Sequence, residues 1–179
     1  MLILNRKFDI RMWALVAHDH RCYLFQEGYI RLSGHDYSLN EKDLDNLFIH
    51  LTNNAIQKKD KDYGKHEEGN QMSFKAASEH TGIDFHQLAK NEILPIVEMT
   101  LISARLKLNK GNRRFCFEIY GYDFMVDEQH KPWLIEVNTN PCLEESSGLL
   151  KQLIPRLLDD TFKLTLDVLY PPIHNIKHL

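Results

Sequence analysis

Hydrophobic and polar residues alternate near the start of the chain. Residues 7–17 read KFDIRMWALVA, and in a β-strand every second side chain points to the same face. The two faces hold Phe8, Ile10, Met12, Ala14 and Val16 on one side and Lys7, Asp9, Arg11, Trp13 and Leu15 on the other. This pattern predicts a half-buried strand. Polar turns separate it from strand-like runs at residues 22–26 and 29–33, so the sequence predicts an antiparallel meander.

Two helices are indicated further along the chain. Asp84 and Gln87 have the spacing of a capping box and open a helical pattern that continues to about Leu108. Pro95 either kinks this helix or lies in the first turn of its second part. Residues 144–169 predict a closing amphipathic helix. Its apolar side chains at helical spacing are Leu149, Leu150, Ile154, Leu157, Leu158 and Phe162.

The segment between these patterns, residues 34–82, shows little periodicity. It is rich in Asp, Asn, Lys and Gly, which predicts loops with short helices. A segment of this length inside a compact domain is either a functional lid or binding segment, or a partly disordered insert. The hydrophobic pattern alone leaves both alternatives open.

Composition narrows the class of protein. A chain of 179 residues that is 43% hydrophobic can bury one core, and antiparallel strands with helices on one side of them predict the α+β class. Its apolar runs are too short to span a bilayer, so we expect a cytoplasmic protein with no membrane partner. A net charge of −3 argues against general nucleic-acid binding. The three cysteines form no CxxC pair, which argues against a zinc knuckle or a disulfide framework.

One stretch departs from this overall charge. Residues 105–114, RLKLNKGNRR, contain five basic residues and no acidic one. Such a run is either a solvated helix end or loop, or a surface that holds an acidic partner.

Two acidic residues fall at unusual positions in a predicted hairpin. The segment LIEVNTNP begins as an apolar strand that enters the core and ends in an acid and amides, with Glu136 and Asn138 on one face. In the strand before it, Asp123 is the single charge in an apolar row. If residues 127–132 form the hairpin loop, then Val126 faces Trp133 and Asp123 lies opposite Glu136.

Two carboxylates in that position repel each other unless something compensates the charge. A magnesium ion held by Asp123, Glu136 and the amide oxygen of Asn138 removes the conflict. The alternatives are that one acid faces solvent because the register is off by one residue, or that both acids pair with Arg or Lys. The same choice applies to Lys7, Asp9 and Arg11, which form either a solvated sheet face or, with Arg31 on a neighbouring strand, a site for phosphate or carboxylate.

Several motifs in order resemble one known family. KFDIR, HLTN followed by IQK, YGKHEEGNQ, GYDFMVD and LIEVNTNP resemble the tubulin tyrosine ligase and tubulin tyrosine ligase-like family in order and spacing, from about Lys7 to Pro172. The resemblance implies the C-terminal lobe of an ATP-grasp fold over residues 1–172, with the family's N-terminal lobe missing, and a tail at residues 173–179.

The resemblance also implies a role for each matching residue. Asp123, Glu136 and Asn138 correspond to the family's magnesium ligands. Arg11 and Arg31 are the expected catalytic residues, because the matching arginines face the γ-phosphate and the reacting carboxylate. The expected ATP-binding residues are Lys7, Asp9, Thr52, Asn53 and Ile135.

The implied activity is an ATP-dependent ligase. It attaches tyrosine, glutamate or glycine to a carboxylate of tubulin through an acyl phosphate, with ATP and Mg²⁺ as cofactors. The expected partners are the acidic C-terminal tail of tubulin and a free amino acid, and the expected location is the cytoskeleton, including a cilium or flagellum. HLTNNAIQK and EEGN favour the tyrosine ligase side of the family. Because upstream lysines of the family's ATP site have no match, the alternative is an acidic-tail-binding module without turnover.

Overall fold

The computed structural model describes residues 1–111 and 113–171. Six strands in this part of the chain form one antiparallel sheet in the order β4-β3-β1-β5-β6, with β2 paired to β1. Their bounds are β1 Arg6–Val16, β2 Cys22–Leu24, β3 Tyr29–Asp36, β4 Gln71–Ser73, β5 Glu118–Val126 and β6 Pro132–Asn138. The predicted antiparallel sheet with packed helices is confirmed. The domain boundary expected at residue 172 and the tail lie outside the described residues.

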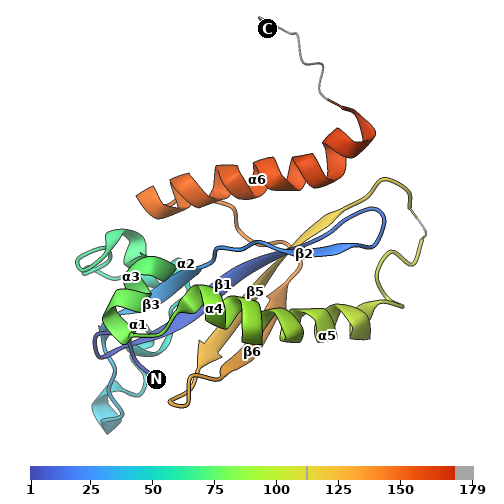
Figure 1. The fold of residues 1–179 in the computed structure, drawn as a ribbon. Coiled ribbons are helices and arrows are strands. Elements are labelled where there is room, and N and C mark those ends of the chain that lie inside the picture. Colours follow the sequence, from blue (N-terminus) through green and yellow to red (C-terminus); the bar gives the residue numbers. More distant parts are fainter. Residues whose placement is uncertain (112, 172–179) are drawn as a thin grey trace, which may run out of the picture.

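Helices cover both faces of the sheet (Figure 1), so the expectation that they pack on one side is wrong. Apolar residues of α3, α4 and α5 share a core cluster with one face of β1, while α6 packs on Trp13 of the other face. The longer helices are α3 Phe74–Thr81, α5 Leu94–Ala104 and α6 Gly148–Leu169. The short ones are η1 Glu41–Asp43, α1 Leu47–His50, α2 Asn54–Gln57, η2 Glu68–Asn70, α4 Phe85–Leu88 and the π-turn η3 Ala89–Ile93.

The central strand β1 is buried on both faces, which corrects the prediction of a half-buried strand. The alternation of its faces is as predicted, with Phe8 and Met12 in the main core. On the second face, α6 covers Trp13, and Asp9 and Arg11 are buried among ionic partners. A polar residue in a strand pattern therefore indicates solvent only where no partner of opposite charge covers it.

The first three strands do not form the predicted meander. β2 pairs with β1 near Val16, and β3 pairs with β1 between Arg6 and Arg11. The strand β5 pairs with the opposite edge of β1. Both β2 and β3 therefore pair with one edge of β1, one after the other along its length. The connection passes very close to β1 at Gly28, where a Cβ atom would lie 2.4 Å from the carbonyl oxygen of Arg11. Only glycine fits this approach.

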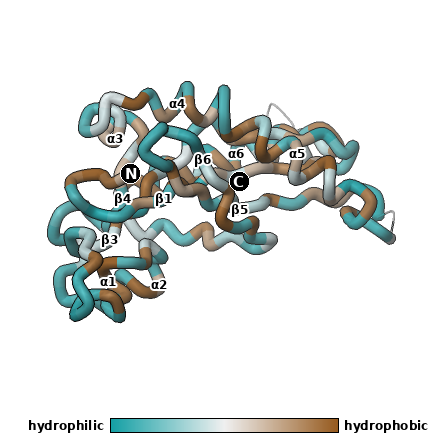
Figure 2. Tube along the Cα trace, turned by 90° about the horizontal axis from the view of Figure 1, so that it is seen from below, coloured by the Kyte–Doolittle hydropathy of each residue, from teal (hydrophilic) through white to brown (hydrophobic). Residues whose placement is uncertain are grey.

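The helical pattern after residue 84 is confirmed in two parts. Asp84 caps α4, its carboxylate accepting a hydrogen bond from the backbone N–H of Gln87 at 3.0 Å. Pro95 lies in the first turn of α5, as the second of the two alternatives predicted, and η3 joins the helices. The hydropathy colouring of Figure 2 shows α5 as predominantly apolar. Neither α5 nor any other helix of the described chain has the length and apolar character needed to cross a membrane.

Residues 34–82 are folded onto the sheet, so the alternative of a partly disordered insert is wrong. The fully buried side chain of Gln57 links three parts of the segment. It accepts hydrogen bonds from Gly34 N at 2.9 Å and Asn70 Nδ2 at 3.0 Å, and it donates to the carbonyl oxygen of Leu51. A buried amide whose hydrogen bonds are all made fixes the fold of an otherwise irregular segment.

The β5–β6 hairpin pairs Asp123 with Glu136, as predicted, but its loop length and register differ from the prediction. Val126 faces Pro132 rather than Trp133, so the loop is one residue shorter than predicted. Phe124 faces Leu134, and a register shift between Asp123 and Phe124 leaves Ile135 as an extra residue and restores the predicted pair. β6 is the last strand on its side of the described sheet, and it reaches the main core only through Leu134, since Trp133 and Ile135 are 52% and 56% exposed.

The closing helix α6 begins later than predicted. Its N-cap is Ser147, whose hydroxyl accepts a hydrogen bond from Leu150 N at 3.2 Å, so the helix starts at Gly148 rather than at residue 144. Leu150, Ile154 and Leu157 are buried as expected. Phe162 is 42% exposed, and its expected place in the buried face is taken by Thr161.

Candidate active site

A cavity of about 170 Å³ opens where β1, β3, β5 and β6 meet the segment after α1. Eight of the ten predicted site residues line it, namely Lys7, Asp9, Arg31, Thr52, Asn53, Asp123, Ile135 and Glu136. The other two, Arg11 and Asn138, lie outside its lining. Residues more than a hundred positions apart in the sequence are thus brought to one place by the order of the strands.

Four charged side chains beside this cavity form one network. Arg31 donates two hydrogen bonds of 2.7 Å to the carboxylate of Asp9. Its Nη2 also lies 2.8 Å from Oδ2 of Asp123. Arg11 donates to the two oxygens of Asp123, from Nε at 2.5 Å and from Nη2 at 3.1 Å. The chain of contacts therefore runs from Asp9 through Arg31 and Asp123 to Arg11.

Burial makes this network electrostatically strong. Asp9, Arg11, Arg31 and Asp123 are each less than a tenth exposed. Burial raises the pKa of Asp123, but hydrogen bonds and charge from Arg11 and Arg31 outweigh it and hold that pKa below its ordinary value. Burial likewise lowers the pKa of Arg31, and the charges of Asp9 and Asp123 raise it above its ordinary value. Asp123 and Arg31 are therefore both charged at neutral pH.

The segment after α1 is tied to β1 by two further hydrogen bonds. The Thr52 hydroxyl donates to Oδ2 of Asp9 at 2.6 Å. Lys7 Nζ donates to the carbonyl oxygen of His50 at 2.6 Å. Asp9 thus accepts bonds from both Arg31 and Thr52, which makes it an anchor that positions these two side chains.

Comparison with known proteins identifies the family. A sequence model of the Tubulin-tyrosine ligase family matches residues 1–177. The chain belongs to the Tubulin-tyrosine ligase family. It is 36% identical over 174 residues to tubulin glycylase 3B and 38% identical over 178 residues to tubulin glycylase 3D, both from Tetrahymena thermophila. It is also 35% identical over 173 residues to the probable alpha-tubulin polyglutamylase Ttll1 of the same organism.

Each of these alignments covers 93% of the chain but only 14%, 17% and 41% of the respective relative. The chain therefore spans less than half the length of the curated relatives it matches. These relatives are glycylases and a polyglutamylase, so they give no support to the preference for the tyrosine ligase side that the sequence suggested.

In this family member, Arg11 reaches the network because Gly121 leaves room for it. A Cβ atom on Gly121 would lie 2.9 Å from Cβ of Pro141 and 3.4 Å from Nη1 of Arg11. Gly121 also faces Asn138 in the β5–β6 register. The glycine of GYDF and the proline after LIEVNTN therefore set the position of the Arg11 guanidinium.

The residues that the family resemblance assigns to magnesium lie together at one end of the hairpin. Asp123 faces Glu136, and Asn138 Nδ2 donates to Glu136 Oε1 at 3.1 Å, which leaves the amide oxygen of Asn138 for another partner. Two carboxylates and an amide oxygen are the ligand types that Mg²⁺ takes, so the residues fit the ion. For Asp123, however, the structure also realises the alternative of arginine pairs, while Glu136 is exposed.

Sequence reasoning missed three residues of the cavity lining, which are His50, Leu51 and Met125. His50 and Leu51 directly precede Thr52, and Met125 shares a strand face with Asp123. All three lie inside the motifs HLTN and GYDFMVD, so counting every residue of these two motifs would have included them.

A second group with metal-ligand chemistry lies elsewhere in the described chain. His35, Asp60 and Asp62 bring ligand-type atoms within 4.8 Å of one another. His35 Nε2 and Asp60 Oδ2 are 2.5 Å apart and hydrogen-bonded. This group is explained by its role in joining β3 to the loop after α2.

Proposed function

We propose that this chain is the C-terminal lobe of an ATP-grasp catalytic domain and that the protein is an ATP-dependent ligase. It attaches tyrosine, glutamate or glycine to a carboxylate of tubulin. ATP supplies the phosphoryl group that converts the acceptor carboxylate into an acyl phosphate, and the amine of the amino acid then displaces phosphate to form the amide.

The observation that carries this proposal is the single cavity that gathers eight predicted site residues. They come from four strands and one loop, and no local sequence feature brings them together. The names of the relatives, which describe glycylation and polyglutamylation of tubulin, support the acceptor and the reaction class. A binding module without turnover needs no such cavity, so the ligase is the better explanation.

The residues have distinct roles in this proposal. Lys7, Asp9, Thr52 and Asn53 hold the nucleotide, with Ile135 forming an apolar part of the wall. Arg11 and Arg31 offset negative charge on the phosphoryl group and the reacting carboxylate, which is the main work of a phosphoryl-transfer site. Asp9 keeps Arg31 in position through its two hydrogen bonds.

The magnesium ligands in the proposal are Asp123, Glu136 and Asn138. Bound magnesium supplies charge neutralisation to the phosphates. Asp123 and Glu136 hold the ion and are not a general acid and base pair, because they lie opposite each other on paired strands rather than across an open cleft. The proposed partners are the acidic tail of tubulin and a free amino acid, and the proposed location is the cytoplasmic cytoskeleton, including cilia or flagella.

The test is an incubation of the protein with tubulin, MgATP and one radiolabelled amino acid at a time. We expect incorporation of tyrosine, glutamate or glycine, formation of ADP, and transfer of ¹⁸O from a labelled acceptor carboxylate into the released phosphate. Formation of AMP instead of ADP would show that the activated intermediate is an adenylate and that the acyl-phosphate mechanism is wrong.

A matched pair of variants links the activity to the cavity. Lys7→Gln removes a charge from the cavity wall, and Lys42→Gln removes one from an exposed position in η1. We expect ATP binding and incorporation to fall only in Lys7→Gln. Equal behaviour of the two variants would show that this cavity is not the nucleotide site.

A further inference from the structure

The arginines of the described chain divide into two groups. Arg6, Arg11, Arg21, Arg31 and Arg156 each form an ion pair with a carboxylate. Arg105, Arg113 and Arg114 form none within residues 1–111 and 113–171, and the same holds for Lys107 and Lys110. These five exposed residues, called the basic cluster below, follow α5 in the sequence. Their charge is not used by the fold, because no acidic residue of the described chain pairs with it.

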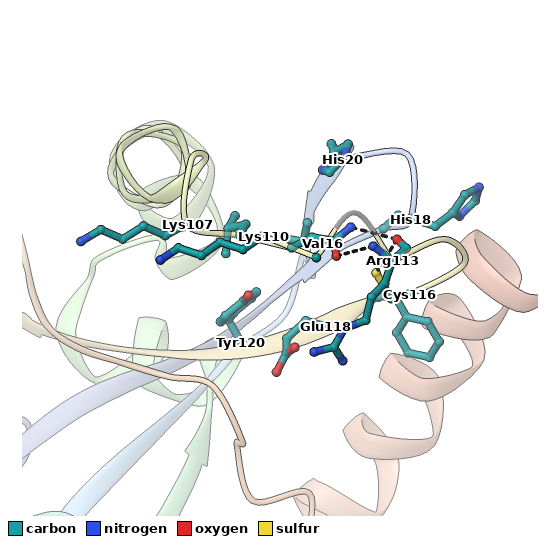
Figure 3. A pocket seen from close by; sticks show the side chains of 14 residues that line it. Val16, His18, His20, Lys107, Lys110, Arg113, Cys116, Glu118 and Tyr120 are labelled. Atoms are coloured by element: carbon teal, nitrogen blue, oxygen red, sulfur yellow. Dashed lines mark hydrogen bonds between the residues drawn. The ribbon is translucent and has the colours of Figure 1, made fainter.

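Part of the basic cluster borders a surface cavity of about 370 Å³ (Figure 3). Its lining includes Lys107, Lys110 and Arg113 and also His18 and His20 of the β1–β2 turn. Glu118 is the single acidic residue of the lining. In Figure 3 the side chains of Lys107 and Lys110 extend in the same direction from the chain after α5. Three permanent cations against one anion make this a positively charged concave surface.

The cavity also has an apolar part. Val16 and Tyr120 are buried and contribute apolar surface, and the Tyr120 ring comes from β5 of the main sheet. Phe115 stands beside the cavity, 63% exposed, with its ring centroid 6.4 Å from that of His18. A ligand with both negative charges and aliphatic chain atoms matches this mixture.

The backbone of Arg113 is tied to its neighbour Asn109. The Asn109 side chain accepts a hydrogen bond from Arg113 N and donates one to Arg113 O, both at 2.9 Å, and dashed lines mark such bonds in Figure 3. Asn109 and Phe115 both have positive φ, at 49° and 58°. Asparagine adopts this conformation more readily than most residues, whereas it is unusual for a bulky side chain such as Phe115.

We propose that this cavity and the basic cluster bind an acidic peptide segment of a partner protein. Glutamate or aspartate side chains pair with Lys107, Lys110 and Arg113, and the peptide chain lies along the apolar surface near Phe115 and Tyr120. A nucleic acid fits less well, because the chain carries a net charge of −3 and Glu118 lies in the lining. This surface is formed by other residues than the candidate active-site cavity.

The proposal rests on the proposed function only for the identity of the partner. If the protein ligates amino acids to tubulin, the peptide segment belongs to the acceptor, and the basic cluster holds it while another part is modified. The binding itself needs neither ATP nor turnover, so it is measured separately from the reaction.

The test is the binding of a short fluorescent oligoglutamate peptide to the protein by fluorescence anisotropy, without nucleotide. The variant Lys107→Gln/Lys110→Gln/Arg113→Gln removes three exposed charges and leaves the backbone contacts of Asn109 in place. Its control is Lys42→Gln/Lys90→Gln/Lys151→Gln, which removes three exposed charges elsewhere. We expect the Kd to rise about tenfold in the first variant only, the size expected when several exposed charge contacts are lost together.

Three other results would overturn the proposal. Equal weakening in both triple variants would mean that binding follows overall charge. Equal binding of a peptide with Gln in place of Glu would exclude recognition of acidic side chains. Tighter binding of single-stranded RNA or of phosphatidylserine vesicles, with the same loss in the first variant, would assign the surface to that partner instead. Peptide binding in a protein that binds no MgATP would contradict the ligase function and leave this inference intact.

Discussion

Arg11 and Asp123 face each other across β1 and β5, and the guanidinium of Arg11 contacts both oxygens of the Asp123 carboxylate. The same carboxylate accepts Arg31 at 2.8 Å. Asp123 is also a proposed magnesium ligand. A cation that binds Asp123 must therefore compete with two arginines, unless the phosphates of a nucleotide draw these arginines away.

This competition predicts that Arg11 weakens cation binding when no nucleotide is present. Arg11→Gln frees one side of Asp123, and we expect the affinity for Mn²⁺, a spectroscopic substitute for Mg²⁺, to rise about tenfold. A charge-assisted hydrogen bond contributes roughly 1.5–3 kcal/mol, which is enough for that change. The measurement is electron paramagnetic resonance of free Mn²⁺ titrated with protein.

The control for this experiment is Arg21→Gln, which breaks an exposed ion pair with Asp19 in the turn between β1 and β2. It changes net charge equally and is expected to leave Mn²⁺ affinity unchanged. Mn²⁺ binding that is equally tight in wild type and Arg11→Gln would show that Arg11 does not compete for Asp123.

A second prediction concerns Glu136, which is exposed on an edge strand and forms no ion pair within the described residues. Glu136→Gln should change the free energy of unfolding by less than about 0.5 kcal/mol, as is usual for surface substitutions. Mn²⁺ affinity in the presence of ADP should fall by at least the roughly 10- to 100-fold seen when residues around metal ligands are changed. Glu128→Gln, in the hairpin loop, is the control and should affect neither quantity. Normal Mn²⁺ affinity in Glu136→Gln would remove this residue from the ligand set.

The sequence predicted the Asp123–Glu136 pair correctly although its count along the hairpin was wrong. The predicted loop was one residue too long, and the extra residue Ile135 compensates for this difference. Alternation along a strand predicts which side chains share a face, but it carries no signal for a bulge. The assignment of Asp123 and Glu136 from the motifs GYDF and LIEVN does not depend on this count.

Other features could not be predicted because they depend on contacts between distant segments. The pattern of β1 identified Asp9 and Arg11 as polar positions but could not show that Arg31 and Asp123 cover them. The pattern also could not show α6 over Trp13, since that contact joins residues more than a hundred positions apart. Gln57 lies in the IQK motif, but nothing in that motif showed that its hydrogen bonds fix the segment that carries Thr52.

A third prediction follows from the lowered pKa of Asp123. A carboxyl group whose pKa is lower in the folded state stabilises the fold above its unfolded pKa, near 3.8, and loses that contribution as pH falls through the folded value. Asp123→Asn should lose about 3–5 kcal/mol at pH 7, because two buried guanidiniums lose a charged partner. Below pH 3.8 the difference between wild type and variant should shrink as wild-type Asp123 is protonated.

Urea unfolding at a series of pH values measures this difference. Asp127→Asn is the control, since Asp127 is only partly buried in the hairpin loop and accepts hydrogen bonds from Gln129 N, Lys131 N and Trp133 Nε1. Asp127→Asn should cost much less at pH 7. A constant difference between wild type and Asp123→Asn at all pH values would show that ionisation of Asp123 does not contribute to stability.

The last prediction tests why Arg31 is an arginine. Its guanidinium makes two bonds to Asp9 and one contact to Asp123 at once, and a lysine ammonium cannot reproduce this planar arrangement. Arg31→Lys keeps the charge, so nucleotide affinity should change little. Turnover should fall about 10- to 100-fold, the loss expected when a charge-assisted bond of roughly 1.5–3 kcal/mol is missing in the transition state.

Two measurements on the same protein separate these effects. Equilibrium binding of a fluorescent ATP analogue gives the affinity, and radiolabelled amino-acid incorporation into tubulin at saturating ATP gives the turnover. Arg156→Lys, which alters an exposed pair with Glu27, is the control and should leave both unchanged. If Arg31→Lys weakened only nucleotide binding and the bound complex turned over normally, Arg31 would hold the ground-state nucleotide and would have no special role in the transition state.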